Sequence, residues 1–98
     1  MRLLALALAA ARAAAAEPRP AQGRYCAVGV DLPGISIGPG AAVGIDLMDC
    51  PSVRIAGGRV RAARCYSPGG AEVSYDTDLA VRPEGALEHD GAVYRPCR

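Results

Sequence analysis

The sequence predicts an all-β domain, a small disulfide-stapled sandwich or meander of six to eight short strands that follows a cleaved signal peptide. The first observation is the spacing of turn signals, which leaves no window long enough for an ordinary helix. These signals are Pro33-Gly34, Gly38-Pro39-Gly40, Gly57-Gly58, Ser67-Pro68-Gly69-Gly70, Pro83-Glu84-Gly85 and Asp90-Gly91. The second is strand-like alternation between them, and the third is a set of four cysteines behind an apolar N-terminal run.

Apolar side chains recur at every second position between the turns, which is the period of a half-buried strand. The alternating sets are Val28 and Val30; Val43, Ile45 and Leu47; Val53 and Ile55; Val73 and Tyr75; and Leu79 and Val81. No internal repeat or second domain is recognisable.

The N-terminus has the pattern of an export signal. Arg2 supplies the positive charge, a Leu/Ala run supplies the apolar segment, and small residues precede a cleavage site after Ala16. The apolar stretch of about 14 residues is shorter than the roughly 20 that span a bilayer, so no membrane span is expected. We therefore divide the chain into a signal peptide (1–16), a flexible leader (17–23) and one small β-domain (24–98), and expect a periplasmic or extracellular protein.

Composition predicts a thin hydrophobic core. The chain has neither Phe nor Trp, and Val, Ile and Leu supply nearly all of its large apolar side chains. A domain of this size barely offsets its conformational entropy by burial, so covalent cross-links are expected to supply the difference. Loss of Arg2 and Arg12 with the signal leaves nine arginines against ten acidic residues, a net charge of about −1.

The segment 52–62 predicts a hairpin with a two-residue turn at Gly57-Gly58. Its register pairs Ile55 with Val60 and Val53 with Ala62, so that each pair of residue numbers sums to 115. Extending the same register brings Cys50 opposite Cys65, at a separation that a disulfide tolerates.

This pairing leaves Cys26 with Cys97, a second bond that would connect the first strand to the last. The main alternative is Cys26 with Cys50 and Cys65 with Cys97. In the nested pattern, the loop-closure model gives a stabilisation of about 3 kcal/mol for the inner bond and about 4.4 kcal/mol for the outer one.

A second hairpin is predicted to turn at Asp90-Gly91 and to pair Leu87 with Tyr94. This register places His89 beside the turn, where we expect a solvated loop residue. As the only histidine, His89 is the one side chain with an unperturbed pKa suited to proton transfer near neutrality, but the sequence offers it no evident partner.

Three further motifs are better explained by structure than by chemistry. Gly34-Ile35-Ser36-Ile37-Gly38 has the G-x-S-x-G spacing of hydrolases, but no helix can follow it, so a plain strand is favoured. Asp76-Thr77-Asp78 has the spacing of calcium ligands without the rest of a calcium loop, and carboxylates that cap a turn explain it better. The cysteines are too widely spaced for zinc, so no metal and no cofactor are expected.

An arginine cluster is the strongest binding signal in the sequence. Arg54, Arg59, Arg61 and Arg64 fall within eleven residues, and in the hairpin register Arg54 stands opposite Arg61 with Arg59 on the same face. Guanidinium groups match the geometry of carboxylates and phosphates. The alternative is a solvated strand face, neutralised by the acidic stretch between Glu72 and Asp90. Nucleic acid is disfavoured because no aromatic residues are interleaved with these arginines.

We therefore expect a small exported, non-catalytic binding or inhibitory module that presents Arg54, Arg59 and Arg61 to an acidic protein or another anionic ligand. A structural accessory subunit of a cell-envelope complex is the second hypothesis, because the edge strands of a thin-cored domain favour association. A minimal hydrolase that uses Ser36 and His89 is the third. The sequence does not specify an oligomeric state.

Overall fold

The computed structural model describes residues 19–98, and the predicted signal peptide and the start of the leader lie outside this range. All regular structure in these residues is β-sheet. The strands are β1 (Gly23–Ala27), β2 (Ile35–Ile37), β3 (Val43–Ile45), β4 (Met48–Cys50), β5 (Arg54–Ala56), β6 (Arg59–Tyr66), β7 (Glu72–Asp78), β8 (Ala80–Val81), β9 (Leu87–His89) and β10 (Ala92–Pro96).

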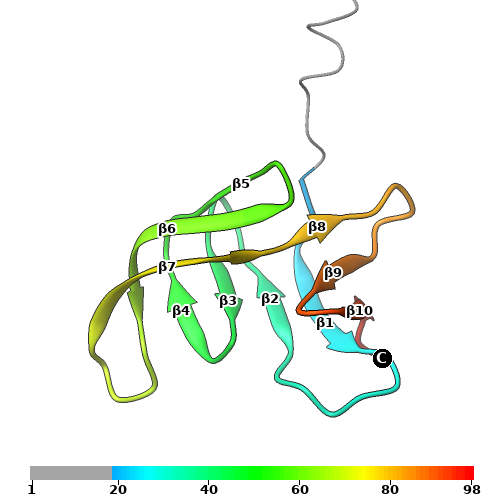
Figure 1. Ribbon diagram of the computed structural model, residues 1–98, viewed down its shortest axis with the longest axis horizontal. Coiled ribbons are helices and arrows are strands. Elements are labelled where there is room, and N and C mark those ends of the chain that lie inside the picture. The colour runs from blue at the N-terminus through cyan, green and yellow to red at the C-terminus, as the bar shows by residue number, and fades with distance from the viewer. Residues whose placement is uncertain (1–18) are drawn as a thin grey trace, which may run out of the picture.

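The ten strands form one antiparallel sheet that is curled into a half-barrel (Figure 1). The order is β5-β6-β4-β3-β2-β1-β10-β9-β8, and β7 pairs with the other side of β6. Only Leu79 separates β7 from β8. The segment 72–81 therefore pairs with β6 at its start and with β9 at its end, so it connects the two ends of the curled sheet.

The sequence predicted six to eight strands, whereas the described residues form ten. All ten belong to one sheet, so the strands do not form the two sheets of a sandwich. Six strands have three residues or fewer. The expected strand through Val43, Ile45 and Leu47 is instead divided into β3 and β4, because Asp46 and Leu47 both adopt positive φ and form the turn between them. Val28 and Val30, predicted to alternate in a strand, lie beyond β1 and are about half exposed.

The core fills the inside of the curl and is built from alternate residues of the strands. Side chains on either side of Ser36 and of Gly44 point inward and are buried. The main cluster consists of Tyr25, Ile35, Ile37, Val43, Ile45, Val60, Leu79, Leu87 and Tyr94. A smaller cluster is formed by Cys50, Ala62 and Cys65. Two tyrosines thus occupy positions that larger proteins often give to Phe or Trp, and burial of both rings enlarges a small core.

Both predicted turns and the registers beside them are confirmed. In the first hairpin, Ile55 pairs with Val60 across Gly57-Gly58. The predicted pair of Val53 with Ala62 is not among the strand pairs, because Val53 lies outside β5 and donates its backbone N–H to the Ala41 carbonyl at 2.8 Å. Asp49 pairs with Tyr66, so the residue numbers of this pair also sum to 115, although the chain leaves the sheet between β4 and β5. In the second hairpin, Leu87 pairs with Tyr94 across the turn at Asp90-Gly91.

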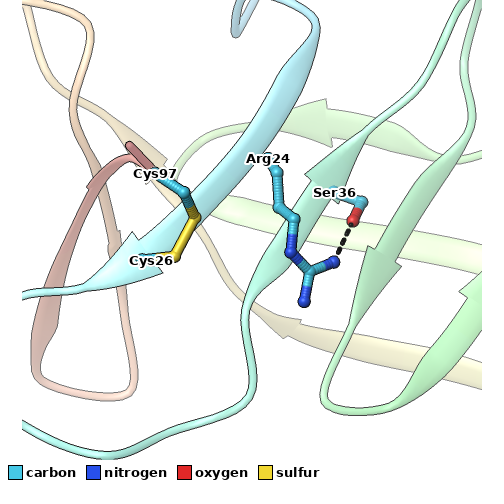
Figure 2. The surroundings of a disulfide bond; sticks show 4 residues. All are labelled: Arg24, Cys26, Ser36 and Cys97. Carbon is cyan, nitrogen blue, oxygen red and sulfur yellow. Dashed lines mark hydrogen bonds between the residues drawn. A yellow bond between two sulfur atoms is a disulfide. The ribbon is translucent and has the colours of Figure 1, made fainter.

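Both predicted disulfides are present, and the alternative pairing is wrong. Cys50 and Cys65 are joined at a Cα separation of 4.2 Å and are buried between β4 and β6. Cys26 and Cys97 are joined at 5.1 Å, on the outer face of the sheet where β1 meets β10 (Figure 2). One bond is therefore sealed inside the domain and the other is accessible from solvent.

The described part of the predicted leader lies against the domain. Pro20 is buried, the Arg19 guanidinium donates to the Gly40 carbonyl, and the Tyr25 hydroxyl donates to the Ala21 carbonyl at 2.8 Å. Within residues 19–98, no helix has the length and apolarity to cross a membrane.

The two disulfides are expected to respond differently to a reductant, because thiol attack requires access to a sulfur atom. Limited dithiothreitol under native conditions should open Cys26–Cys97 first and leave Cys50–Cys65 intact. Alkylation followed by peptide mass mapping measures the order. Simultaneous opening of both bonds in a sample that remains folded would contradict this assignment of accessibility.

Leu47→Gly is expected to stabilise the protein. Leu47 has φ 65° and is 67% exposed, so its backbone is strained and its side chain contributes little burial. Left-handed backbone costs an L-residue about 1–2 kcal/mol, part of which glycine returns as entropy of the unfolded chain. Urea unfolding should show a gain of up to about 1 kcal/mol. A loss of stability would mean that contacts of the leucine side chain stabilise the protein by more than the backbone strain destabilises it.

Candidate functional site

The three arginines of the predicted binding face lie together on the outer surface of β5 and β6. Arg54 pairs directly with Arg61. Arg59 lies two residues before Arg61 in the sequence, on the same face of β6. They point outward because the intervening Val60 points into the core and is 2% exposed. The sequence-derived geometry of this face is therefore correct.

Asp76 of β7 completes this arginine face, which we define as Arg54, Arg59, Arg61 and Asp76. One carboxylate accepts from the Nε of Arg59 at 2.9 Å and approaches the Nε of Arg61 at 3.3 Å. Its position follows from the register, in which Asp76 stands opposite Arg61. Arg64 has a separate partner in Glu72, at 3.5 Å.

The charge of the arginine face is not balanced by Asp76. Arg54 makes no ion pair within residues 19–98, and two further guanidinium groups share a single carboxylate. The side chains of Arg59, Arg61 and Asp76 are 43–66% exposed. Water and salt therefore screen these ion pairs, which contribute little to stability. The face can therefore accept another carboxylate or phosphate by rearrangement of exposed side chains, without disturbance of the core.

A hollow lies beside the arginine face. The register of β6 against β7 shifts between Ala62 and Cys65, which is the effect of a β-bulge. The hollow has a volume of about 380 Å³ and is lined by Arg61, Ala62, Ala63, Ser74, Tyr75 and Asp76. Because Arg61 and Asp76 belong both to the hollow and to the charged face, a ligand group could enter it while it remains in contact with a guanidinium.

The prediction that His89 is a solvated turn residue is wrong. Its side chain is on the inner face of β9 and only 3% exposed. Nε2 lies 2.8 Å from Oδ1 of Asp46, and Nδ1 lies 2.7 Å from the backbone carbonyl of Asp78. The turn at Asp90-Gly91 starts immediately after His89, but the inward direction of residue 89 is set by the same alternation that buries Leu87.

Asp46 connects three elements at this position. Its second carboxylate oxygen accepts from the Tyr75 hydroxyl, so β7 and β9 both contact the turn between β3 and β4. A second carboxylate, that of Asp78, accepts from the backbone N–H of Asp90 at 2.9 Å. We call Asp46, Tyr75, Asp78 and His89 the His89 network. The alternation of Leu87 with His89 was a signal for the inward direction of His89. Nothing in the sequence identified its distant partners.

The pKa of His89 results from opposing effects. Burial alone lowers it, but the hydrogen bonds to Asp46 and to the Asp78 carbonyl, with the charges of both carboxylates, raise the pKa above its ordinary value. Burial, followed by the hydrogen bond to Asp46, raises the pKa of Tyr75 to about 12. A histidine that has both ring nitrogens engaged and is stabilised in its charged form is suited to a structural ion pair rather than to proton abstraction.

The structure does not bring Ser36 and His89 together as a hydrolase would require. Ser36 lies in β2, the plain strand that was predicted, between the buried Ile35 and Ile37. Its side chain is therefore on the outer face of the sheet, whereas His89 is on the inner face. The hydroxyl of Ser36 accepts instead from the Arg24 guanidinium at 3.3 Å (Figure 2).

Asp76 and Asp78 both lie within β7. The prediction that they cap a turn is wrong for Asp76, which belongs to the arginine face. Asp78 does accept from a turn residue, the backbone N–H of Asp90, and belongs to the His89 network. Among residues 19–98, no group of three or more His, Cys, Asp or Glu side chains has the arrangement of a metal site.

Protein stability is expected to fall with rising pH through the titration of His89. The folded protein holds the imidazole proton more tightly than the unfolded chain does. The His89–Asp46 contribution is therefore complete below the unfolded pKa of about 6.5 and is lost as pH rises through the raised folded pKa. His89→Gln retains hydrogen-bonding capacity without the titration. Urea unfolding from about pH 6 to pH 8.5 should show a downward slope in the wild-type protein that the variant lacks. Parallel profiles would contradict the assignment.

Comparison with known proteins identifies no relative. No family model, no curated protein and no solved structure matches this chain. The functional conclusion is therefore built on the residues of the chain itself.

Proposed function

We propose that this protein is a small exported binding or inhibitory module that uses Arg54, Arg59 and Arg61 to contact an anionic partner, and that it performs no catalysis. The single observation that carries the proposal is the direct pairing of Arg54 with Arg61. Like charges opposite each other on adjacent strands reduce the stability of a sheet. An anionic partner on this face would turn that repulsion into a binding interaction.

The surroundings of the arginines support the same role. The single carboxylate of Asp76 is shared by two guanidinium groups, which leaves the face positively charged. The adjoining hollow adds a concave contact for a side chain of the partner. An acidic protein surface fits both features, because it brings several carboxylates to a strand face that is held rigid by the neighbouring Cys50–Cys65 bond.

Export also belongs to the proposal. The N-terminal pattern at 1–16 is that of a signal peptide. Two disulfides within residues 26–97 suit an oxidising compartment such as the periplasm or the extracellular medium. The expected partner is then a protein or another polyanion of that compartment.

Neutralisation of the arginine face should weaken binding to an acidic probe. Poly-glutamate titrated into the wild-type protein at low salt is expected to bind measurably. The variant Arg54→Gln plus Arg61→Gln should bind about tenfold more weakly, which is the effect of losing two exposed charge contacts of a few tenths to about 1 kcal/mol each. Isothermal titration calorimetry measures the affinity, and thermal unfolding checks that the fold is retained.

The matched control is Arg82→Gln plus Arg95→Gln, which removes the same charge from residues that contact Glu84 in the segment beside β8. Binding by this variant should differ from the wild type by less than about twofold. Equal weakening by both pairs would show that net charge alone attracts the probe, and the proposal would be wrong.

A further inference from the structure

A second surface, separate from the arginine face, crosses the outside of β1, β2, β3 and β4. The registers of these strands place four residues in one straight row. Arg24 pairs with Ser36, Ser36 pairs with Gly44, and Gly44 pairs with Asp49. All four lie on the outer face because their neighbours Tyr25, Ile35 and Ile45 point into the core.

The row forms the floor of a groove. Its middle carries only a hydroxymethyl group and a hydrogen atom, at Ser36 and Gly44, so the sheet is hollowed between the longer side chains at each end. The groove has a volume of about 490 Å³. Pro33 and Leu47 give it apolar walls, and Leu47 is the most exposed of the large apolar side chains in residues 19–98.

The groove carries one cation and one anion that do not pair with each other. The only side-chain hydrogen bond of Arg24 within the described residues runs from its guanidinium to the hydroxyl of Ser36 (Figure 2). Asp49 has no ion pair and no side-chain hydrogen bond within residues 19–98, and its residue is exposed. The two opposite charges at the ends of an apolar groove are therefore both available to a ligand.

We propose that this groove binds a short extended peptide, with its free carboxylate on Arg24 and its free amino group on Asp49. The Arg24 guanidinium reaches the position of Ser36, which is two strands from Asp49, or about 9.6 Å at the usual strand spacing. Three extended residues span about 10 Å, so a tripeptide fits the separation of the charges. Its central side chain then lies against Leu47.

Charge complementarity selects this occupant. A ligand with only an anionic group would leave Asp49 beside its apolar body, and one with only a cationic group would leave Arg24 unpaired. A free tripeptide satisfies both ends with charge-assisted hydrogen bonds. The proposal does not depend on the function proposed for the arginine face, since the two surfaces share no residue.

The test is a calorimetric titration of the intact domain with the tripeptide Ala-Leu-Ala and with its N-acetylated and C-amidated forms. The free peptide should bind, and each blocked form should bind about tenfold more weakly because one charge-assisted hydrogen bond is lost. Arg24→Gln should weaken binding of the free peptide by a similar factor and remove the effect of amidation. Asp49→Asn should do the same for acetylation.

Two further variants separate the groove from general effects. A Cβ on Gly44 would meet only ordinary contacts, at 3.6 Å from the Ser36 Cβ and 3.7 Å from the Met48 carbonyl oxygen, so Gly44→Val should fold. It fills the floor and should abolish binding with an unchanged unfolding midpoint. Arg82→Gln, which removes an arginine outside both the groove and the arginine face, should leave the affinity unchanged.

Absence of saturable binding up to about 10 mM peptide would overturn the proposal. So would equal affinity for the free and blocked peptides, or equal weakening by Arg24→Gln and Arg82→Gln. Because poly-glutamate binding is measured separately, failure at the groove leaves the arginine face unaffected.

Discussion

The fold depends on one segment, residues 72–81, which is bonded to both ends of the same sheet. At its start it pairs with β6 and at its end with β9, while Leu79 between them is fully buried and donates its backbone N–H to the Gly58 carbonyl at 3.0 Å. A sheet of short strands with few large side chains would expose its inner face if it remained open. The double pairing holds the sheet curled, and the curl gives a small set of aliphatic and tyrosine side chains an interior to occupy.

The other stabilising features are placed where this curl would otherwise open. The His89 network connects the turn between β3 and β4 to β7 and β9. Cys50–Cys65 fixes β4 to β6 close to the point where the chain leaves the sheet, and Cys26–Cys97 fixes β1 to β10. The core is therefore supplemented by covalent and polar contacts between elements that are distant in sequence. This arrangement also leaves the outer faces of the strands free to carry charges that contribute little to folding.

Local features of the fold and of the arginine face could be predicted from the sequence, and long-range ones could not. Gly57-Gly58 and Asp90-Gly91 specify their turns through positive φ, and a two-residue turn fixes the register of every pair beyond it. The Cys50–Cys65 bond and the opposition of Arg54 and Arg61 follow from the register of the first hairpin, and the Cys26–Cys97 bond then follows by elimination. The inward direction of His89 could have been predicted from its alternation with Leu87. Its partners could not, because Asp46 lies in the turn between β3 and β4 and the Asp78 carbonyl belongs to β7. The row from Arg24 to Asp49 could not be predicted, because it depends on the registers of three strand pairs at once. One of these registers is set by the turn at Asp46-Leu47, which contains no glycine as a turn signal.

The neighbouring positions of β1 and β10 have a consequence for how the chain can be rearranged. The first and last strands of the domain are hydrogen-bonded to each other and joined by a disulfide, so the sheet is nearly circular in its connectivity. A short linker could fuse these two strands, and new termini could be opened in an exposed glycine loop such as Gly69-Gly70 without loss of any strand pairing. The same architecture could therefore form from a chain in which the strands follow one another from a different starting point.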